Sequence, residues 1–184
     1  AGEEAAVTLV ADLLGKHGIK ADTHSKGETR LAHSPRALNK MMREAEEIAA
    51  SGGTADFQTR SQLASVGLNG EFYGALTTPV GFGLNPRKYL FGLTRAAGQA
   101  GVQLFQHSPA LKITAAGNEH LVTTPKGTVR SNQVVIATNG YSSDDLPRWL
   151  AARYMPTQST AMVTRPLRKE ELQAQGWFSD QMAY

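Results

Sequence analysis

The sequence has no cysteine and no long apolar run. The absence of cysteine excludes disulfides, thiolate catalysis and zinc sites built on sulfur. The longest apolar stretch is too short to cross a lipid bilayer. The first residues enter an amphipathic pattern directly and so do not resemble a signal peptide. We therefore expect no membrane partner, and the cytoplasm is the simplest location.

The chain also lacks a cluster of charge of one sign, although its net charge is +3 and its pI is near 9.3. The densest basic run, residues 165–169, holds three basic side chains and is followed at once by Glu170 and Glu171. A surface that follows nucleic-acid phosphates needs a clustered basic stripe with aromatic stacking platforms. The dispersed charge therefore predicts that nucleic acid is not a partner.

No pattern of metal ligands is present. The five histidines lie in different predicted elements, without the spacing of a metal site, so solvated or locally hydrogen-bonded rings are expected. They are His17, His24, His33, His107 and His120. Asp144 and Asp145 form either a carboxylate pair or, more commonly for adjacent acids, the cap of a short helix.

Two helices are predicted in the first part of the chain. Residues 3–19 carry apolar side chains at helical spacing. Ser34 can cap free amides and Pro35 suits a first turn, so a second helix begins there and ends at residues 51–53, Ser-Gly-Gly. Its predicted inward face holds Leu38, Met41, Met42, Ala45, Ile48 and Ala49. The two methionines on this face are expected to fill the core.

A third helix is predicted after Asn85 and Pro86, which repeat the capping signal, and it ends near Gly101. Its predicted inward residues are Leu90, Leu93, Ala97 and Ala100. A fourth, short helix is predicted over residues 168–175.

The predicted strands are residues 72–76, 102–105, 134–136 and 154–164, together with a three-stranded meander over 110–115, 121–124 and 128–129. The order helix, strand, meander, strand over residues 86–140 is typical of α/β sheets. Residues 134–136, Val-Val-Ile, do not alternate with polar residues, which predicts a strand covered on both faces.

Small and polar residues follow that strand: residues 137–140 read Ala-Thr-Asn-Gly. In open α/β sheets, ligands bind beyond the carboxyl ends of the parallel strands. Small residues let the main chain approach a bulky ligand, and amide and hydroxyl groups can bond a pyrophosphate or a ribose. A tight turn without a ligand explains the pattern as well, because Asn-Gly is a common turn pair. Spacing alone leaves both interpretations open.

Four segments resemble one flavoenzyme superfamily, that of D-amino-acid oxidase, glycine oxidase and sarcosine oxidase. Residues 134–141, Val-Val-Ile-Ala-Thr-Asn-Gly-Tyr after a Gly-Thr-Val hairpin, resemble its second flavin-contacting motif. Residues 84–90 resemble its Asn-Pro helix start, and residues 101–110 its Gly-Val strand. Residues 162–167 resemble a later strand of its substrate domain. The segments follow the family's order over essentially all 184 residues, and the most similar branch is that of γ-glutamylputrescine oxidase-like amine oxidases.

The resemblance implies FAD as the cofactor. Ala110, where the family usually has valine, would contact the adenine ring through its backbone. Ala137, Thr138, Asn139 and Gly140 would border the adenosine and pyrophosphate half. The implied reaction is oxidation of a small-molecule amine or amino acid, with hydride transfer to the flavin and hydrolysis of the imine by water. Oxygen would then regenerate the flavin and release hydrogen peroxide.

One departure from the family is serious. The family's Gly-x-Gly-x-x-Gly loop, which holds the pyrophosphate at a helix start, is missing. The nearest match, residues 81–86, ends in proline and follows a turn with Pro79 rather than a buried strand. The chain therefore resembles an internal piece of a longer oxidase. We expect that the chain alone does not hold FAD tightly and is inactive.

The implied fold is a mixed α/β (α+β) chain. It holds a partial FAD-binding, Rossmann-like half with a β-meander, interleaved with part of an antiparallel-sheet substrate domain. Residues 1–85 would form a helical segment and part of the substrate domain, and residues 86–145 part of the FAD-binding domain. Residues 146–184 would add a strand and a helix of the substrate domain.

The reaction itself cannot be assigned to particular side chains. Phe82, in the loop before Asn85, is a candidate substrate contact, although an aromatic anchor for the loop is the more common role. No residue is identified as catalytic, because there is no cysteine nucleophile, metal cluster or convincing acid–base pair. The alternative functions are a non-catalytic α/β binding or interaction domain and another flavin or nicotinamide enzyme. A truncated face is expected to expose an apolar seam, which self-association could cover.

Overall fold

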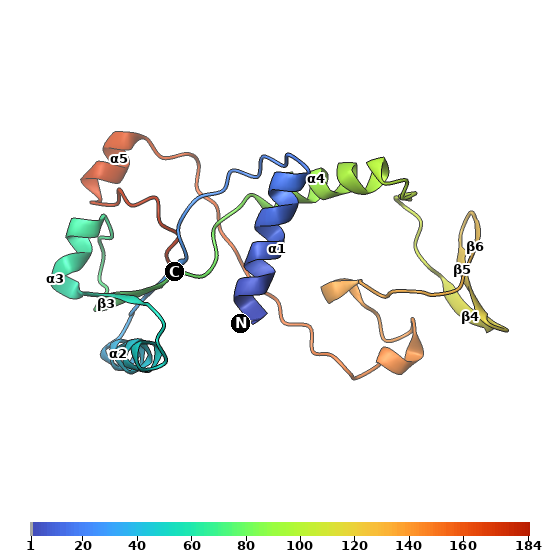
Figure 1. The fold of residues 1–184 in the computed structure, drawn as a ribbon, viewed down its shortest axis with the longest axis horizontal. Helices are drawn as coiled ribbons and strands as arrows, with labels where there is room; N and C mark the ends of the chain where they lie inside the picture. Colours follow the sequence, from blue (N-terminus) through green and yellow to red (C-terminus); the bar gives the residue numbers. More distant parts are fainter. Residues whose placement is uncertain (1) are drawn as a thin grey trace. The chain divides into compact units, whose positions relative to one another are not determined.

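The structure is a computed structural model that describes residues 2–184. The chain forms two compact units. Unit 1 runs to Val102 and takes in Thr164–Tyr184, and unit 2 is Gln103–Val163. Each unit contains a three-stranded antiparallel sheet (Figure 1). The strand order is β1 (Glu28–Leu31), β3 (Gly74–Thr78), β2 (Asp56–Thr59) in unit 1. In unit 2 it is β4 (Lys112–Ala116), β5 (Glu119–Thr124), β6 (Gly127–Ser131). The assignment of residues 1–85, 86–145 and 146–184 to an FAD-binding and a substrate domain stays a prediction.

The elements are short. The helices are α1 (Gly2–Lys16), α2 (Pro35–Ala50), α3 (Arg60–Leu63), α4 (Pro86–Gln99) and α5 (Lys169–Ala174). The strands of unit 1 are β1 (Glu28–Leu31), β2 (Asp56–Thr59) and β3 (Gly74–Thr78). Those of unit 2 are β4 (Lys112–Ala116), β5 (Glu119–Thr124) and β6 (Gly127–Ser131).

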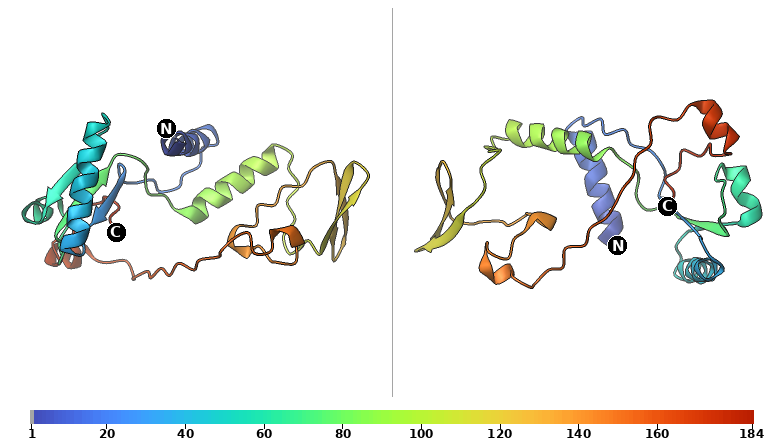
Figure 2. Two further views of the ribbon diagram at one scale, coloured as in Figure 1. Left: turned by 90° about the horizontal axis from the view of Figure 1, so that it is seen from below. Right: turned by 180° about the vertical axis from the view of Figure 1, so that it is seen from behind.

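Both faces of the β1-β3-β2 sheet are covered. Successive side chains of a strand point to opposite faces, so Leu76 and Ala75 of β3 enter different clusters. Leu76 packs with Ala32 and Met41 under α2, which lies beside the strands in Figure 2. Ala75 packs with buried leucines on the other face, beneath α3. The core of unit 1 is therefore built on β3.

The capping signal of α2 is confirmed, and half of its methionine prediction is wrong. The Ser34 hydroxyl accepts the amide of Ala37 at 3.2 Å, and Pro35 occupies the first turn. Met41 is buried, whereas Met42 is 43% exposed. Neighbouring residues on a helix point about 100° apart, so only one of the two can face the sheet directly.

The start of α4 is confirmed, but its buried face differs from the predicted one. Asn85 caps the helix by accepting a backbone amide at 3.2 Å. Gly92 and Ala96 are buried, whereas Leu90 is 60% exposed. A Cβ at Gly92 would lie 2.4 Å from Cγ2 of Ile19, so the small residue admits that side chain. The absence of a side chain at Gly92 therefore lets this face of α4 pack against Ile19.

The end of the chain lies beside β1. The amide of Thr29 donates to the carbonyl of Met182 at 3.0 Å, and the amide of Tyr184 donates back to Thr29 at the same distance. The amide of Leu31 donates to Tyr184 at 2.6 Å. The bridge between Thr29 and Ala183 is parallel. This pairing, across about 150 residues of sequence, has no local signal.

The predicted helix over residues 168–175 is confirmed as α5, which Glu171 caps. Its carboxylate accepts two bonds from the Arg165 guanidinium, at 2.9 and 2.6 Å, and the backbone amide of Arg168 at 2.8 Å. Chiefly because of the Arg165 bonds, the pKa of Glu171 is lowered from 4.5 to about 2. Its stabilising effect is therefore complete above pH 4.5 and is lost as the pH falls toward 2.

We expect Glu171→Gln to lower the Tm by at most a few degrees at neutral pH, because the carboxylate is solvated. The difference from the wild type should shrink as the pH falls from 4.5 toward 2. Thermal unfolding followed by circular dichroism in a series of buffers measures it. The control is Glu170→Gln, which leaves the three bonds in place. An undiminished difference at low pH would contradict the role assigned to Glu171.

The meander of unit 2 is confirmed, and three other predicted strands are wrong. Residues 102–105, 134–136 and 154–164 form no strand. Val135, expected to be buried on both faces, is 86% exposed, and Phe105 is 70% exposed. A strand exists only where its amides pair with a neighbour. Among the described residues, no segment pairs with these three, so they do not form strands despite their high β propensity.

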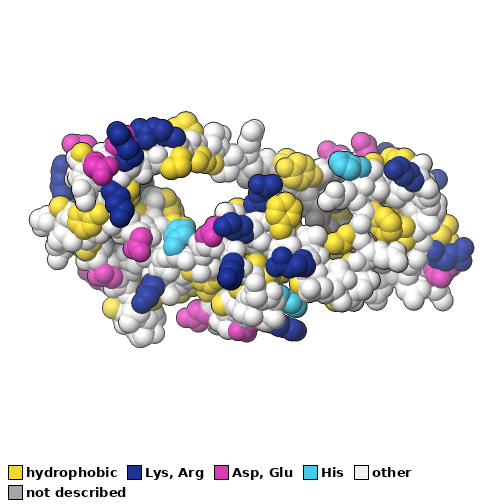
Figure 3. All heavy atoms as spheres, turned by 90° about the horizontal axis from the view of Figure 1, so that it is seen from above, with side chains coloured by type: hydrophobic (Ala, Val, Ile, Leu, Met, Phe, Trp, Pro, Cys, Tyr) yellow, Lys and Arg dark blue, Asp and Glu magenta, His cyan; other side chains and the backbone are white. Residues whose placement is uncertain are grey.

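Both units have exposed large hydrophobic side chains, and hydrophobic side chains are scattered over the face shown in Figure 3. Those of unit 2 include the unpaired segments just described. In the part of the chain that the structure describes, every helix is too short or too polar to span a membrane.

Candidate functional site

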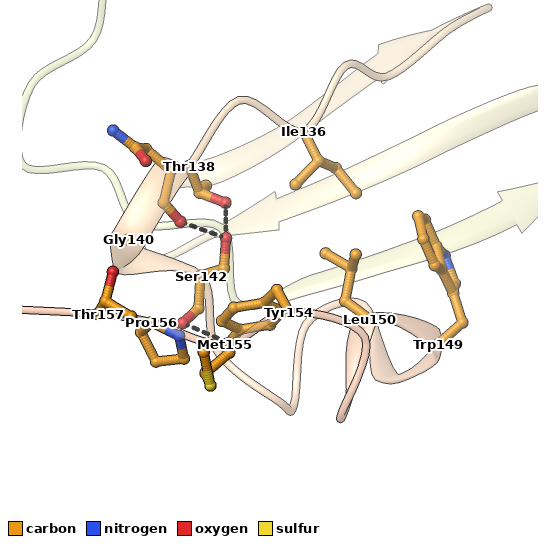
Figure 4. A pocket seen from close by; sticks show the side chains of 11 residues that line it. Ile136, Thr138, Gly140, Ser142, Trp149, Leu150, Tyr154, Met155, Pro156 and Thr157 are labelled. Atoms are coloured by element: carbon orange, nitrogen blue, oxygen red, sulfur yellow. Dashed lines mark hydrogen bonds between the residues drawn. The ribbon is translucent and has the colours of Figure 1, made fainter. Parts of the chain in front are cut away.

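The Ala-Thr-Asn-Gly corner borders a cavity of about 420 Å³ in unit 2 (Figure 4). Thr138, Asn139 and Gly140 line one side of the cavity, and residues 149–157 supply most of the other. Ala137, between the lining residues Ile136 and Thr138, does not itself line the cavity. Three of the four residues predicted at this corner therefore meet in one concave site.

The corner folds as a one-turn 3₁₀ helix, Asn139–Tyr141. The amide of Tyr141 donates to the carbonyl of Thr138 at 3.0 Å, and that of Ser142 to the carbonyl of Asn139 at 3.2 Å. Asn139 has a φ of +48°, a left-handed conformation that asparagine tolerates better than most residues. The residue types of the corner thus suit the sharp change of chain direction.

Hydroxyl groups brace the corner, and one of them joins it to the opposite wall. The Ser142 hydroxyl donates to the carbonyl of Asn139 at 2.8 Å. Thr138 Oγ1 is 2.6 Å from Ser142 Oγ and is therefore the donor of that bond, which leaves its lone pairs free to accept. The Tyr154 hydroxyl donates to the carbonyl of Ser142 at 2.8 Å. Figure 4 shows these three bonds meeting at Ser142.

The opposite wall was missed by the sequence reasoning. Trp149, Leu150, Tyr154 and Met155 line it, and Trp149 and Met155 remain largely exposed. The sequence predicts a strand over residues 154–164, whereas in the structure this segment is not a strand and its side chains line the cavity at residues 154–157. The available signal was a pair of aromatic residues, Trp149 and Tyr154, in a segment that Pro147 and Pro156 flank.

The main chain of the corner has unused hydrogen-bond donors. No hydrogen bond among the described residues uses the amides of Asn139 or Gly140, as expected for the first amides of a helical turn. A Cβ built on Gly140 meets no atom within 4 Å, so the main chain is open to a ligand. Free main-chain amides in a turn can donate hydrogen bonds to an anion such as a phosphate. The side chains of the chain itself do not fill the corner.

Ala110 lies in a different cavity of unit 2. This cavity of about 500 Å³ is lined by Ala110, Phe105 and residues of β5 and β6, among them Val122 and Val129. Ala110 is exposed. The structure thus does not bring Ala110 and the residues of the corner into one cavity, and the cofactor contacts named for both stay predictions.

Phe82 is half-buried in unit 1 and lines a third cavity, of about 380 Å³, with His24 and Ser25. Its role as a substrate contact stays a prediction. The histidine and the serine were not among the predicted site residues. Within residues 2–184, no group of three acidic, histidine or cysteine side chains could hold a metal ion.

The chain belongs to the family described as FAD dependent oxidoreductase (DAO), whose model matches residues 2–183. The family is FAD-dependent, and the resemblance drawn from the four sequence segments is confirmed at this level. FAD is therefore the cofactor of the protein family to which these residues belong.

The chain is 26% identical over 167 residues to a probable oxidoreductase, OrdL, of Haemophilus influenzae; this covers 88% of the chain and 38% of that protein. Glycine oxidase from Geobacillus kaustophilus superposes with a TM-score of 0.62 at 23% identity, over 71% of the chain and 36% of the oxidase. L-proline dehydrogenase from P. horikoshii superposes with a TM-score of 0.63 at 20% identity, over 76% and 38%.

The chain thus spans less than two fifths of each of these relatives. The structural similarity confirms the fold class, a partial mixed α/β fold of the FAD-dependent oxidases. Its helices and small antiparallel sheets account for the part of that fold that the described residues contain.

Proposed function

We propose that the chain acts as part of an FAD-dependent oxidoreductase that oxidises a small-molecule amine or amino acid. The observation that carries the proposal is the open corner at Thr138, Asn139 and Gly140, with free amides beside a cavity. The small residues of the corner let a ligand approach the main chain closely. The membership of the chain in an FAD-dependent family supports the choice of ligand.

The residues of unit 2 have separate tasks in this proposal. The amides of Asn139 and Gly140 bind pyrophosphate oxygens, and Thr138 Oγ1 accepts a bond from a ribose hydroxyl. The backbone of Ala110 contacts the adenine ring. The Tyr154 hydroxyl holds the corner in place through its bond to the carbonyl of Ser142. When bound, FAD supplies the acceptor for a hydride from the α-carbon of the substrate.

The substrate class follows from the family and from the kinds of oxidase that share the fold. The names of glycine oxidase and L-proline dehydrogenase state amino-acid substrates for those proteins. The sequence resemblance to amine oxidases extends the proposal to primary and secondary amines. Phe82 is proposed as a substrate contact.

Among residues 2–184 there is no glycine-rich phosphate loop between a strand and a helix. We therefore propose that this chain alone binds FAD weakly and has no oxidase activity, and that further residues complete the cofactor site. Saturable FAD binding by the isolated chain, tighter than micromolar, would contradict this part of the proposal.

We expect Gly140→Asp to weaken FAD binding by about tenfold or more in the full-length protein that contains this chain. A carboxylate placed beside phosphate oxygens adds like-charge repulsion, and a change of this size corresponds to about 1.4 kcal/mol. Fluorescence titration of the apoprotein with FAD measures it. The matched control is Gly15→Asp in α1, where a Cβ also meets no atom within 4 Å. Equal FAD affinities of the two variants would show that the corner is not part of the cofactor site.

The non-catalytic binding domain remains the alternative function. A peroxide assay of the FAD-loaded full-length protein, against a panel of amines and amino acids, separates the two. Substrate-dependent peroxide supports the oxidase. FAD binding without peroxide for any member of the panel would favour a binding role.

A further inference from the structure

The cavity beside the Ala-Thr-Asn-Gly corner has two ends of different character. The end at the corner carries hydroxyl groups and open main chain, and the other end carries three large apolar side chains. The first is formed by Thr138, Gly140 and Ser142, and the second by Ile136, Trp149 and Leu150. Figure 4 shows these two groups on either side of Tyr154. A ligand that fills the cavity therefore has a polar group joined to an apolar part.

Trp149 is the aromatic residue of the apolar end. Its backbone belongs to a one-turn 3₁₀ helix, Arg148–Leu150. The amide of Leu150 donates to the carbonyl of Pro147 at 2.9 Å, and the amide of Ala151 donates to the carbonyl of Arg148 at 3.1 Å. Trp149 nevertheless remains 62% exposed. A tryptophan can bury about 150–250 Å² of surface, so much of this area is open to a ligand.

Core packing does not account for Trp149. The two buried clusters found in residues 2–184 both lie in unit 1, and Trp149 packs against neither of them. The other tryptophan of the chain, Trp177, differs in this respect, because it is partly buried against the leucine cluster of unit 1. Trp149 instead presents its apolar surface at the wall of a cavity.

We propose that Trp149 is a cofactor-binding residue that stacks on a planar ring of the dinucleotide. The inference rests on the proposed function, in which the corner binds the pyrophosphate. Ile136 and Leu150 add apolar contacts to the same ring. Indole groups stack readily on flat heteroaromatic rings. FAD has such a ring on each side of its pyrophosphate, adenine on one side and isoalloxazine on the other.

Fluorine NMR of the full-length protein that contains this chain, labelled with 5-fluorotryptophan, tests the contact. The Trp149 signal is assigned by its loss in Trp149→Phe, and flavin fluorescence follows the binding of FAD independently. The Trp149 signal should shift saturably as FAD binds, with the Trp177 signal as the internal control. FAD binding that leaves the Trp149 signal unmoved would overturn this inference alone. Absence of FAD binding would overturn the proposed function together with it.

Two half-ligands identify the ring that stacks on Trp149. ADP carries the adenine ring and FMN carries the isoalloxazine ring, and each also carries a phosphate group for the corner. The half-ligand that shifts the Trp149 signal at the lower concentration contains the stacked ring. A response to ADP would place the adenine at Trp149 rather than at Ala110, whereas a response to FMN agrees with the adenine contact proposed for Ala110.

Variants distinguish stacking from simple filling of space. Trp149→Ala should weaken FAD binding about tenfold, as measured by fluorescence titration of the apoprotein. Trp149→Phe keeps a ring and should recover most of the affinity, whereas Trp149→Leu keeps apolar volume without a ring and should not. The control Phe91→Ala removes an aromatic ring that is 55% exposed on α4 and should bind as the wild type does. Equal affinities of Trp149→Leu and Trp149→Phe would contradict the stacking role.

Discussion

Gly27→Ala is expected to destabilise the chain by about 3 kcal/mol, as the sum of a backbone cost and a steric cost. Gly27 has a φ of +84°, and a Cβ there would lie 1.9 Å from the carbonyl oxygen of Thr78. That oxygen belongs to the end of β3, so the clash can be relieved only by moving the central strand. The amide of Gly27 also donates to Gly81 at 2.8 Å, which holds the loop that carries Phe82.

Urea unfolding followed by circular dichroism measures the loss. Gly52→Ala is the matched control, because Gly52 has a φ of +80° and a Cβ there meets no atom within 4 Å. The control should lose only the conformational part, about 1 kcal/mol. Equal losses in the two variants would show that the contact with Thr78 contributes nothing.

Leu76→Ala is expected to destabilise the chain by roughly 2–5 kcal/mol. Leu76 is fully buried in the centre of β3, between Ala32 and Met41. Removing its branched end loses apolar burial and leaves a cavity between the sheet and α2, into which the neighbouring side chains relax only in part. The decrease in the free energy of unfolding is measured in the same urea experiment.

The control for Leu76→Ala is Leu90→Ala, in which the same atoms are removed from a side chain that is 60% exposed. It should change stability by about 0.5 kcal/mol or less. If Leu90→Ala proved as costly as Leu76→Ala, α4 rather than β3 would lie in the core of unit 1.

Signals confined to a few neighbouring residues predicted their elements well. Ser34 and Asn85 each place a side-chain acceptor before a first turn, and the structure contains both bonds. The meander was predictable for the same reason, because each of its strands reaches its partner through a turn of two residues.

Residues 102–105 and 134–136 show where such signals stop. Their β-branched and apolar side chains favour a strand, but no segment among the described residues pairs with them. A high β propensity lets a segment fit into a sheet, but the segment becomes a strand only when a neighbouring strand pairs with it. Val135 is therefore exposed although its sequence is typical of a buried strand.

The candidate sites were likewise predictable from the sequence only in part. The resemblance to a flavoenzyme family directed attention to Asn139 and Gly140, and the structure leaves their amides open beside a cavity. The opposite wall, with Trp149 and Tyr154, carried no motif. The contact of Ser25 with Met182 joins segments that are far apart in the sequence, and no local pattern indicates it.

The sequence by itself determined the family, the helix starts and the hairpins, because each depends on residues that are close along the chain. Only the tertiary structure decided which side chains face one another across a cavity, and which face of α4 is buried. It also decided that the last residues of the chain run beside β1. Such contacts depend on bringing distant segments together, and their free energy comes from packing and pairing that no single segment contains.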